Sequence, residues 1–172
     1  MARTPGKTKA AAPAWADPGT PSPSDKITAV KVWMRVMTCN KLVQSHLRNR
    51  LRTNFDTTLP RFDILAQIDR VPRGPTMGEL SQRLMVTKAN ITDLFGRLEA
   101  EGLVTRKSCK KDGRVQHVYL TPRGKSELDT MLNAHTAWLT QLMQRVPQDD
   151  LKALNNILGR LNETLKETNE GQ

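Results

Sequence analysis

The sequence predicts a mainly α-helical fold with one small β-hairpin, in a chain of 172 residues that has about the length of one compact domain. Apolar residues recur every three or four positions through most of the chain, between residues that favour helix ends. Residues 103–120 depart from this period, because two β-prone runs flank Asp112-Gly113, a pair typical of tight hairpin turns. We therefore expect four helices, the hairpin, and two further helices.

A long first helix is expected from Ser24 or Asp25, either of which can cap it, to about Leu51. Its apolar residues fall into two rows: Ile27, Val30, Met34 and Met37, and then Val36, Val43, Leu47 and Leu51. Two rows indicate contacts on two sides of the helix, one with its own domain and one with something else.

Two shorter helices follow. Pro60 opens the first of them, and the proline- and glycine-rich residues 72–75 end it. Its apolar residues are Phe62, Leu65 and Ile68. Thr76 and Glu79 have the spacing of a capping box, in which a hydroxyl and a carboxylate satisfy the first backbone N–H groups of a helix. They start a short helix that is expected to end near Leu84.

A fourth helix leads into the hairpin. Thr87 is expected to cap this helix and Gly102 to end it, because glycine takes a left-handed conformation at low cost. Its inward residues are expected to be Ile91, Leu94, Phe95 and Leu98. The hairpin strands are expected at Leu103–Cys109 and Val115–Leu120, with the basic turn at residues 110–114 between them.

Two helices complete the chain. Thr121-Pro122 places a cap before a proline at the first helical position, and that helix carries Leu128, Leu132, His135, Leu139 and Leu142. Pro147 starts the last helix, with Asp149 and Asp150 in its first turn, where the helix dipole favours anions. Leucines then recur at alternating steps of three and four, at Leu151, Leu154, Leu158, Leu161 and Leu165. This heptad-type seam indicates a partner helix; packing on its own domain is the alternative.

The composition indicates a polyanionic partner. Lys and Arg number 27 against 17 Asp and Glu, which gives a net charge of +10. Aromatic residues make up 4%, too few for a large enzyme cavity. No run approaches the roughly 18 apolar residues of a membrane span, and no apolar segment of a secretory signal follows the N-terminus. We expect a soluble cytoplasmic protein without membrane contact.

No pattern for a metal, a cofactor or a catalytic centre is apparent. Cys39 and Cys109 form no CxxC pair, so neither a disulfide scaffold nor a zinc site is expected. His46, His117 and His135 are scattered, and neither a Ser/His/Asp arrangement nor a glycine-rich phosphate loop is present. We expect no cofactor, no metal and no enzymatic activity.

Two short helices with a tight link and a basic hairpin form the pattern of a winged helix-turn-helix, whose second helix enters the major groove of DNA. The DNA-binding residues expected on that helix are Thr87, Lys88, Asn90 and Thr92. Lys pairs with guanine acceptors and Asn with the adenine edge. The wing adds Arg106, Lys107, Lys110, Lys111 and Arg114, which suit the negative minor groove; a solvated turn is the alternative.

The distribution of charge divides the chain into four segments. Residues 1–24 hold five of the ten prolines and carry +2, which predicts a disordered arm. Residues 25–59 carry +5 and are expected to form an N-terminal dimerisation helix. Residues 60–121 carry +4 and are expected to form the winged helix-turn-helix DNA-binding domain. Residues 122–172 carry −1 and are expected to form C-terminal dimerisation helices.

The stretch Thr87–Arg114 resembles the recognition helix and wing of MarR-type transcriptional regulators, and Leu120–Gly124 resembles the exit from that wing. The resemblance covers roughly residues 26–168. It implies a homodimer whose first and last helices interlock, bound to a pseudo-palindromic operator. Lys88 and Asn90 would read bases, and Asp112 would hold Arg114 in the wing. Two positions depart from the family: Gly113 replaces the first of two arginines, and Asp93 stands where many members are basic.

The resemblance also implies a small anionic aromatic effector. Residues 26–52 contain seven Lys or Arg and no acid, which is similar to the branch of the family that responds to aromatic acids or their coenzyme A thioesters, such as hydroxycinnamoyl-CoA, in aromatic compound catabolism. The ligand-binding residues expected are Trp33, Met37, His46, Arg48, Arg50 and Phe62, with either arginine as the anion partner. The alternative is that the apolar residues of this set, Trp33, Met37 and Phe62, belong to the hydrophobic core. We expect effector binding to change the spacing of the recognition helices and relieve repression.

The sequence permits two other functions. Cys39 lies in the first helix and a basic neighbour could lower its pKa, as a redox-sensing regulator of the same family requires; a buried, inert thiol is the alternative. A non-specific architectural DNA binder would share the basic charge but show no preference for one palindrome at fixed salt. Asn90 and the leucine seam argue against it.

Overall fold

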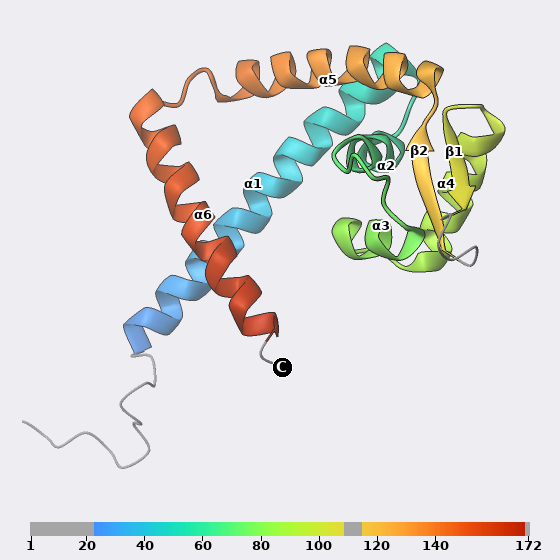
Figure 1. The fold of residues 1–172 in the computed structure, drawn as a ribbon. Helices are drawn as coiled ribbons and strands as arrows, with labels where there is room; N and C mark the ends of the chain where they lie inside the picture. The colour runs from blue at the N-terminus through green and yellow to red at the C-terminus, as the bar shows by residue number, and fades with distance from the viewer. Residues whose placement is uncertain (1–22, 109–114, 171–172) are drawn as a thin grey trace, which may run out of the picture. The chain divides into compact units, whose positions relative to one another are not determined.

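The computed structural model describes residues 23–108 and 115–170, so residues 1–22 of the expected arm and the wing turn lie outside the described residues. The last two residues of the expected arm, Pro23 and Ser24, are helical. The described elements follow the predicted order (Figure 1): α1 Pro23–Phe55, α2 Leu59–Asp69, α3 Met77–Leu84, α4 Lys88–Ala100, β1 Val104–Ser108, β2 Gln116–Leu120, α5 Pro122–Met143 and α6 Gln148–Glu170. Two compact units meet between Ser45 and His46, so α1 contributes to both. The mainly α-helical fold with a hairpin wing is confirmed.

Helix α1 continues four residues beyond the predicted Leu51. It ends at Phe55, where Asp56 takes a left-handed conformation with φ of 47°. The Thr57 N–H then donates to the Leu51 carbonyl over 3.4 Å, a bond typical of a helix C-terminus. Because an aspartate rather than a glycine occupies this position, the stop signal is not visible in the sequence.

The two apolar rows of α1 differ in burial. Leu47 and Leu51, from the second row, are buried in the second unit. The first row is exposed, and so is Trp33, which is 60% exposed. Val36 of the second row is also exposed, at 38%, so within the described residues burial is confined to the C-terminal part of that row, and contact on two sides of α1 stays a prediction.

The α3–α4 pair forms as predicted. Thr76 accepts a hydrogen bond from the Glu79 N–H, and the Glu79 carboxylate accepts one from the Thr76 N–H over 2.7 Å, which completes the capping box. Met85, with φ of 53°, turns the chain between the helices. The buried face of α4 is Ile91, Phe95 and Leu98. Leu94, predicted to face the core, is only half-buried, because it lines a surface cavity.

The hairpin pairs β1 with β2 in antiparallel register, Val104 opposite Leu120 and Ser108 opposite Gln116. The segment before α3 extends this sheet through a bridge between Thr76 and His117. Gly74 permits the close approach: its φ is +70°, and a Cβ there would lie 2.6 Å from the Val118 carbonyl oxygen. The strand positions therefore depend on the loop that ends α2.

Helix α5 starts at the predicted cap, where Thr121 accepts a hydrogen bond from the Gly124 N–H over 3.0 Å. Its side chains Leu128, Met131 and Trp138 are buried. Helix α6 instead exposes an apolar stripe, whose members are Leu154, Ile157, Leu158, Leu161 and Leu165. Apart from the half-buried Leu151, the predicted seam is thus uncovered within the described chain. No helix described here is long and apolar enough to cross a membrane.

Candidate nucleic-acid interface

The N-terminal end of α4 presents the predicted base-reading residues to solvent. Thr87, Lys88, Asn90 and Thr92 are all exposed. Two of them are engaged locally: the Thr87 hydroxyl accepts from the Asn90 N–H over 3.4 Å, and the Thr92 hydroxyl donates to the Lys88 carbonyl over 2.8 Å. The side chains of Lys88 and Asn90 have no partner among the described residues, so these two are available to an external ligand.

Asp93 shares the exposed side of α4. Helical spacing places it nearly opposite the buried Ile91, Phe95 and Leu98, and its carboxylate is 65% exposed. It pairs with Arg97 over 3.0 Å. The acid that departs from the family pattern therefore neutralises a cation of the same helix.

The wing strand places one predicted cation in a structural position. Arg106 Nε lies 3.2 Å from a Glu99 carboxylate oxygen, and its guanidinium lies 4.7 Å from the centre of the Phe95 ring. The contact with Glu99 is an ion pair without hydrogen-bond alignment. Glu99 and Phe95 therefore engage Arg106 within the described chain, and its role as a wing cation for DNA stays a prediction.

Lys107 is the exposed cation of β1. Its ammonium lies 5.2 Å from the centre of the Tyr119 ring on β2, so the alkyl stem crosses the hairpin while the charge faces solvent. The predicted wing-tip residues Lys110, Lys111 and Arg114, with Asp112, lie outside the described residues.

The loop before α3 fixes β2 through side chains. The Tyr119 hydroxyl donates to the Arg73 carbonyl over 2.6 Å, and His117 Nδ1 lies 2.8 Å from the Gly74 carbonyl oxygen. Arg73 forms an ion pair with Glu79. The Thr76 N–H and then Arg73 lower the pKa of Glu79 to about 2. One carboxylate thus joins the cap of α3 to the loop that supports the hairpin.

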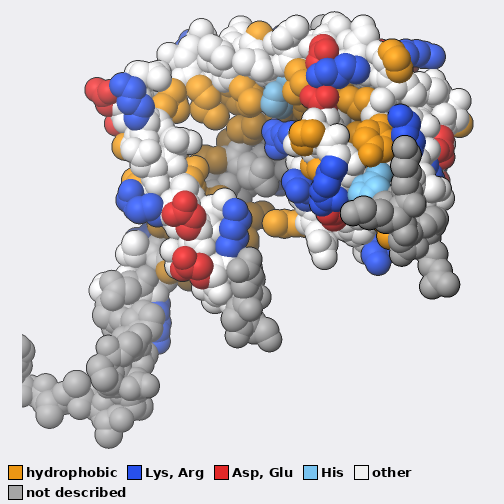
Figure 2. All heavy atoms as spheres, in the orientation of Figure 1, with side chains coloured by type: hydrophobic (Ala, Val, Ile, Leu, Met, Phe, Trp, Pro, Cys, Tyr) orange, Lys and Arg blue, Asp and Glu red, His pale blue; other side chains and the backbone are white. Residues whose placement is uncertain are grey.

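Ion pairs neutralise much of the positive charge of the DNA-binding lobe, residues 60–121. Figure 2 shows Lys and Arg side chains spread over it with fewer Asp and Glu between them. Four of its arginines are paired, namely Arg61, Arg73, Arg97 and Arg106. Within the described part of residues 60–121, the cations outside such pairs are Arg70, Arg83, Lys88 and Lys107.

Two of the predicted effector residues line one shallow cavity of about 430 Å³. His46 and Arg50 form it with Asn49, Thr53 and Asn54, and no acid lines it. The Arg50 guanidinium lies 5.9 Å from the centre of the Trp138 ring. His46 Nε2 is buried without a hydrogen-bond partner in the described structure. Among its described lining residues the cavity therefore has one cation, Arg50, and no acid.

The other predicted effector residues lie elsewhere. Phe62 is buried and stacks on His135 with ring centres 4.9 Å apart. Arg48 is exposed, as are Trp33 and Met37, at 60% and 43%. The alternative that both Trp33 and Met37 are core is wrong within the described chain, because no described side chain covers them.

Cys39 is also exposed. The prediction of a buried thiol at this position is therefore wrong. Its neighbours on this stretch of α1 are themselves exposed, and the thiol is open to solvent.

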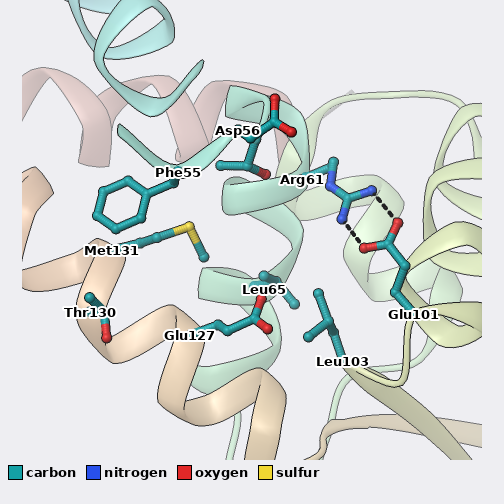
Figure 3. Close-up of a pocket in the computed structure, with 10 residues that line it drawn as sticks. Phe55, Asp56, Arg61, Leu65, Glu101, Leu103, Glu127, Thr130 and Met131 are labelled. Atoms are coloured by element: carbon teal, nitrogen blue, oxygen red, sulfur yellow. Dashed lines mark hydrogen bonds and ion pairs between the residues drawn. The ribbon is translucent and has the colours of Figure 1, made fainter. Parts of the chain in front are cut away.

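A second cavity, of about 450 Å³, lies where α1 ends against α2 and α5. Figure 3 shows Arg61 pointing toward Glu101 in its wall, joined by two hydrogen bonds, one of 2.7 Å. Arg61 lowers the pKa of Glu101, and the hydrogen bonds that Arg61 donates to Glu101 raise the pKa of Arg61. The sequence offers no signal for this pair, because the two residues are 40 positions apart.

A third cavity, of about 360 Å³, adjoins the start of α4. It lies between α2 and α4 and includes Asn90, Asp93 and Leu94 on α4 and Asp63 on α2. Burial raises the pKa of the Asp63 carboxyl, while the positive charge of Arg70 lowers it by less. Sequence reasoning missed this site as well, since its two acids come from different helices.

Comparisons with known proteins agree with this architecture. A model of the MarR family matches residues 55–115. An HTH-type transcriptional regulator of Bacillus cereus is 29% identical over 119 residues, 69% of this chain and 78% of that relative. The HTH-type transcriptional repressor YetL of Bacillus subtilis is 33% identical over 87 residues, 51% of this chain and 52% of YetL. The crystal structure of the MarR family regulator Sco3205 from Streptomyces coelicolor, in complex with DNA, superimposes with a TM-score of 0.69 at 24% identity, covering 87% of this chain and 92% of that chain.

Proposed function

The chain belongs to the MarR family of winged-helix transcriptional regulators, and we propose that it is a homodimeric repressor that binds a pseudo-palindromic operator. Members of this family regulate transcription and are not enzymes, as expected from the sequence. One observation carries the proposal: the side chains of Lys88 and Asn90 are exposed at the start of α4 and have no partner in the described parts of the chain. Lysine bonds guanine acceptors, and asparagine bonds the adenine edge in the major groove.

A second copy of the chain is the partner that the helices require. The exposed apolar row of α1 and the stripe of α6 have no cover within the described chain, and apolar surface of this extent favours association. A two-fold dimer would place two copies of α4 about 34 Å apart, the spacing of successive major grooves. Repression is favoured over activation because a relative that is 33% identical is named a repressor.

The effector that we propose is an aromatic acid or its coenzyme A thioester. Support comes from the cavity at His46 and Arg50, which has a cation and no acid. Arginine pairs with carboxylates through two parallel hydrogen bonds. Arg48 is exposed but does not line this cavity. The effector would favour a dimer with a different spacing of the two α4 helices, and the affinity for DNA would fall.

Operator binding is tested by fluorescence anisotropy with the duplex upstream of the protein's own gene and a scrambled duplex at the same salt concentration. We expect much tighter binding to the upstream duplex, and a dimer by light scattering at micromolar concentration. Equal affinity for both duplexes would identify a non-specific architectural binder. A monomeric chain would also overturn the proposal.

The effector is tested by a thermal-shift screen of aromatic acids and their coenzyme A thioesters. A compound that raises the melting temperature should also release the upstream duplex. Arg50→Gln should abolish both effects, whereas Arg145→Gln, an exposed arginine outside the cavity, should retain them. If Arg50→Gln responds like the wild type, the assignment of the effector site is wrong.

A further inference from the structure

The cavity between α2 and α4 has the composition of a small-molecule site. Its volume of about 360 Å³ lies within the range of ligand pockets. Six of its lining residues are apolar: Pro60, Ile64, Leu84, Val86, Ile91 and Leu94. The polar ones are Asp63, Asn90 and Asp93. An apolar wall with a few polar groups is typical of a pocket that buries an organic molecule and orients it by one end.

The charge of this cavity is negative. Two carboxylates line it, and neither a lysine nor an arginine does. Asp93 already has Arg97 as its partner, but Asp63 is half-buried and forms no ion pair among the described residues. Burial weakens the solvation of this carboxylate, and the positive charge of Arg70 compensates only part of that loss. A ligand cation next to Asp63 would compensate for the remaining loss of solvation.

We propose that this cavity binds an organic cation, namely a protonated amine or quaternary ammonium on a small apolar or aromatic body. The apolar wall covers the body of the ligand, and Asp63 pairs with its cationic end. The Asn90 amide oxygen accepts a further hydrogen bond from an ammonium group. The charge preference is opposite to that of the arginine-lined cavity on α1, so the two cavities select different compounds.

Ligand binding in this cavity should affect operator binding. This consequence rests on the proposed function. Asn90 lines the cavity and is also one of the two exposed side chains expected to read bases. A ligand that engages Asn90 occupies a side chain that the major groove would contact. Binding of the cation and binding of the operator should therefore oppose each other, and by linkage the effect is equal in both directions.

Cation binding is tested without DNA, on the full chain with labelled isoleucine and leucine methyl groups. The probes are phenethylammonium, the anion phenylacetate and the neutral 2-phenylethanol, at fixed ionic strength with ammonium chloride as a salt control. We expect phenethylammonium alone to shift the methyl signals of Ile64 and Leu94 in a saturable way. Equal shifts with phenylacetate, or no shift with phenethylammonium, would overturn the proposal.

The role of Asp63 is tested by Asp63→Asn, which removes the charge and keeps the shape. Its dissociation constant for phenethylammonium should rise at least about tenfold. Asp69→Asn is the matched control, because Asp69 also lies on α2 but pairs with Lys125 outside the cavity, and its affinity should stay at the wild-type value. Unchanged affinity in Asp63→Asn, in a protein whose melting temperature shows that it is folded, would overturn the assignment.

The link to DNA is tested by adding phenethylammonium to the complex with the upstream duplex. We expect release in the wild type and in Asp69→Asn but not in Asp63→Asn. If the chain binds the cation saturably but binds no duplex selectively, the cation site is supported and the proposed function is refuted. Selective operator binding that saturating phenethylammonium leaves unchanged would refute the coupling.

Discussion

Arg106→Ala distinguishes a structural arginine from a DNA-contacting one. In the folded chain its guanidinium covers the Phe95 ring of α4 at 4.7 Å and pairs with Glu99, with the side chain one-third exposed. These contacts join β1 to the recognition helix. The substitution should therefore reduce the free energy of unfolding and leave the number of phosphate contacts unchanged.

The magnitude follows from the two contacts. A cation over an aromatic ring is worth about 0.5–1 kcal/mol at exposed sites and about 2 kcal/mol when desolvated. A partly exposed ion pair adds about 0.2–1 kcal/mol. We expect Arg106→Ala to cost about 1–2 kcal/mol of stability. Lys107→Ala, the neighbouring control, loses one exposed cation–ring contact of 5.2 Å and should cost about 0.5 kcal/mol.

Two assays read the two roles. Urea denaturation gives the free energies of unfolding, and a double-mutant cycle with Glu99→Ala isolates the ion pair. Anisotropy at several salt concentrations gives the slope of log affinity against log salt, which falls by about one for each lost phosphate contact. Arg106→Ala should keep the wild-type slope, and Lys107→Ala should lower it. Full stability in Arg106→Ala together with a slope lowered by about one would refute the structural role.

Four further predictions concern the cap, the packing, the base contact and the thiol. Because the pKa of Glu79 is about 2 in the folded chain against an ordinary 4.5, its contribution is present above pH 4.5 and lost as the pH falls toward 2. Denaturation should thus show Glu79→Ala about 1 kcal/mol less stable than the wild type at pH 7 and nearly equal to it at pH 2. Gly124→Ala places a Cβ 1.9 Å from the Leu103 carbonyl oxygen and should cost at least about 2 kcal/mol, whereas Gly159→Ala, in open space on α6, should stabilise the helix by about 0.5–1 kcal/mol; a calorimetric scan compares them. In a binding-site selection, Asn90→Ala should relax preference at one base position at a cost of about 1–3 kcal/mol, and Arg114→Ala should weaken all duplexes alike; identical profiles would contradict the roles given to them. Finally, hydroperoxide should affect the operator affinity of Cys39→Ser and of the wild type equally, and a loss confined to the wild type would establish redox sensing.

Local chemistry explains why the element order could be predicted from the sequence. The caps Thr76, Thr87 and Thr121 each bond a backbone N–H three residues on, and this reach is visible in sequence spacing. Gly102 takes a φ of +73° after α4, as glycines at helix ends do. The end of α1 escaped prediction because Asp56 adopts a left-handed conformation that is unusual outside glycine.

The candidate sites were only half predictable, because they join residues far apart in the chain. Lys88 and Asn90 were found from the pattern of the helix that carries them. The pairing of Arg106 with Glu99 and the position of Asp63 beside Asp93 arise from packing. No periodicity reports such contacts, so charges that look equivalent in the sequence acquire different roles in the fold.

This difference changes how the basic charge of the chain should be interpreted. The net charge of +10 predicts strong, salt-sensitive binding to any polyanion if every cation is available. In the described part of residues 60–121, four arginines are paired with carboxylates, and one of these carboxylates, Asp93, neutralises Arg97 on the helix expected in the groove. Non-specific attraction is reduced where the groove would be contacted, while Asn90 and Lys88 keep their hydrogen-bonding groups. Since base contacts specify and phosphate contacts position, an interface of this kind should derive more of its operator preference from those two side chains than its overall charge implies.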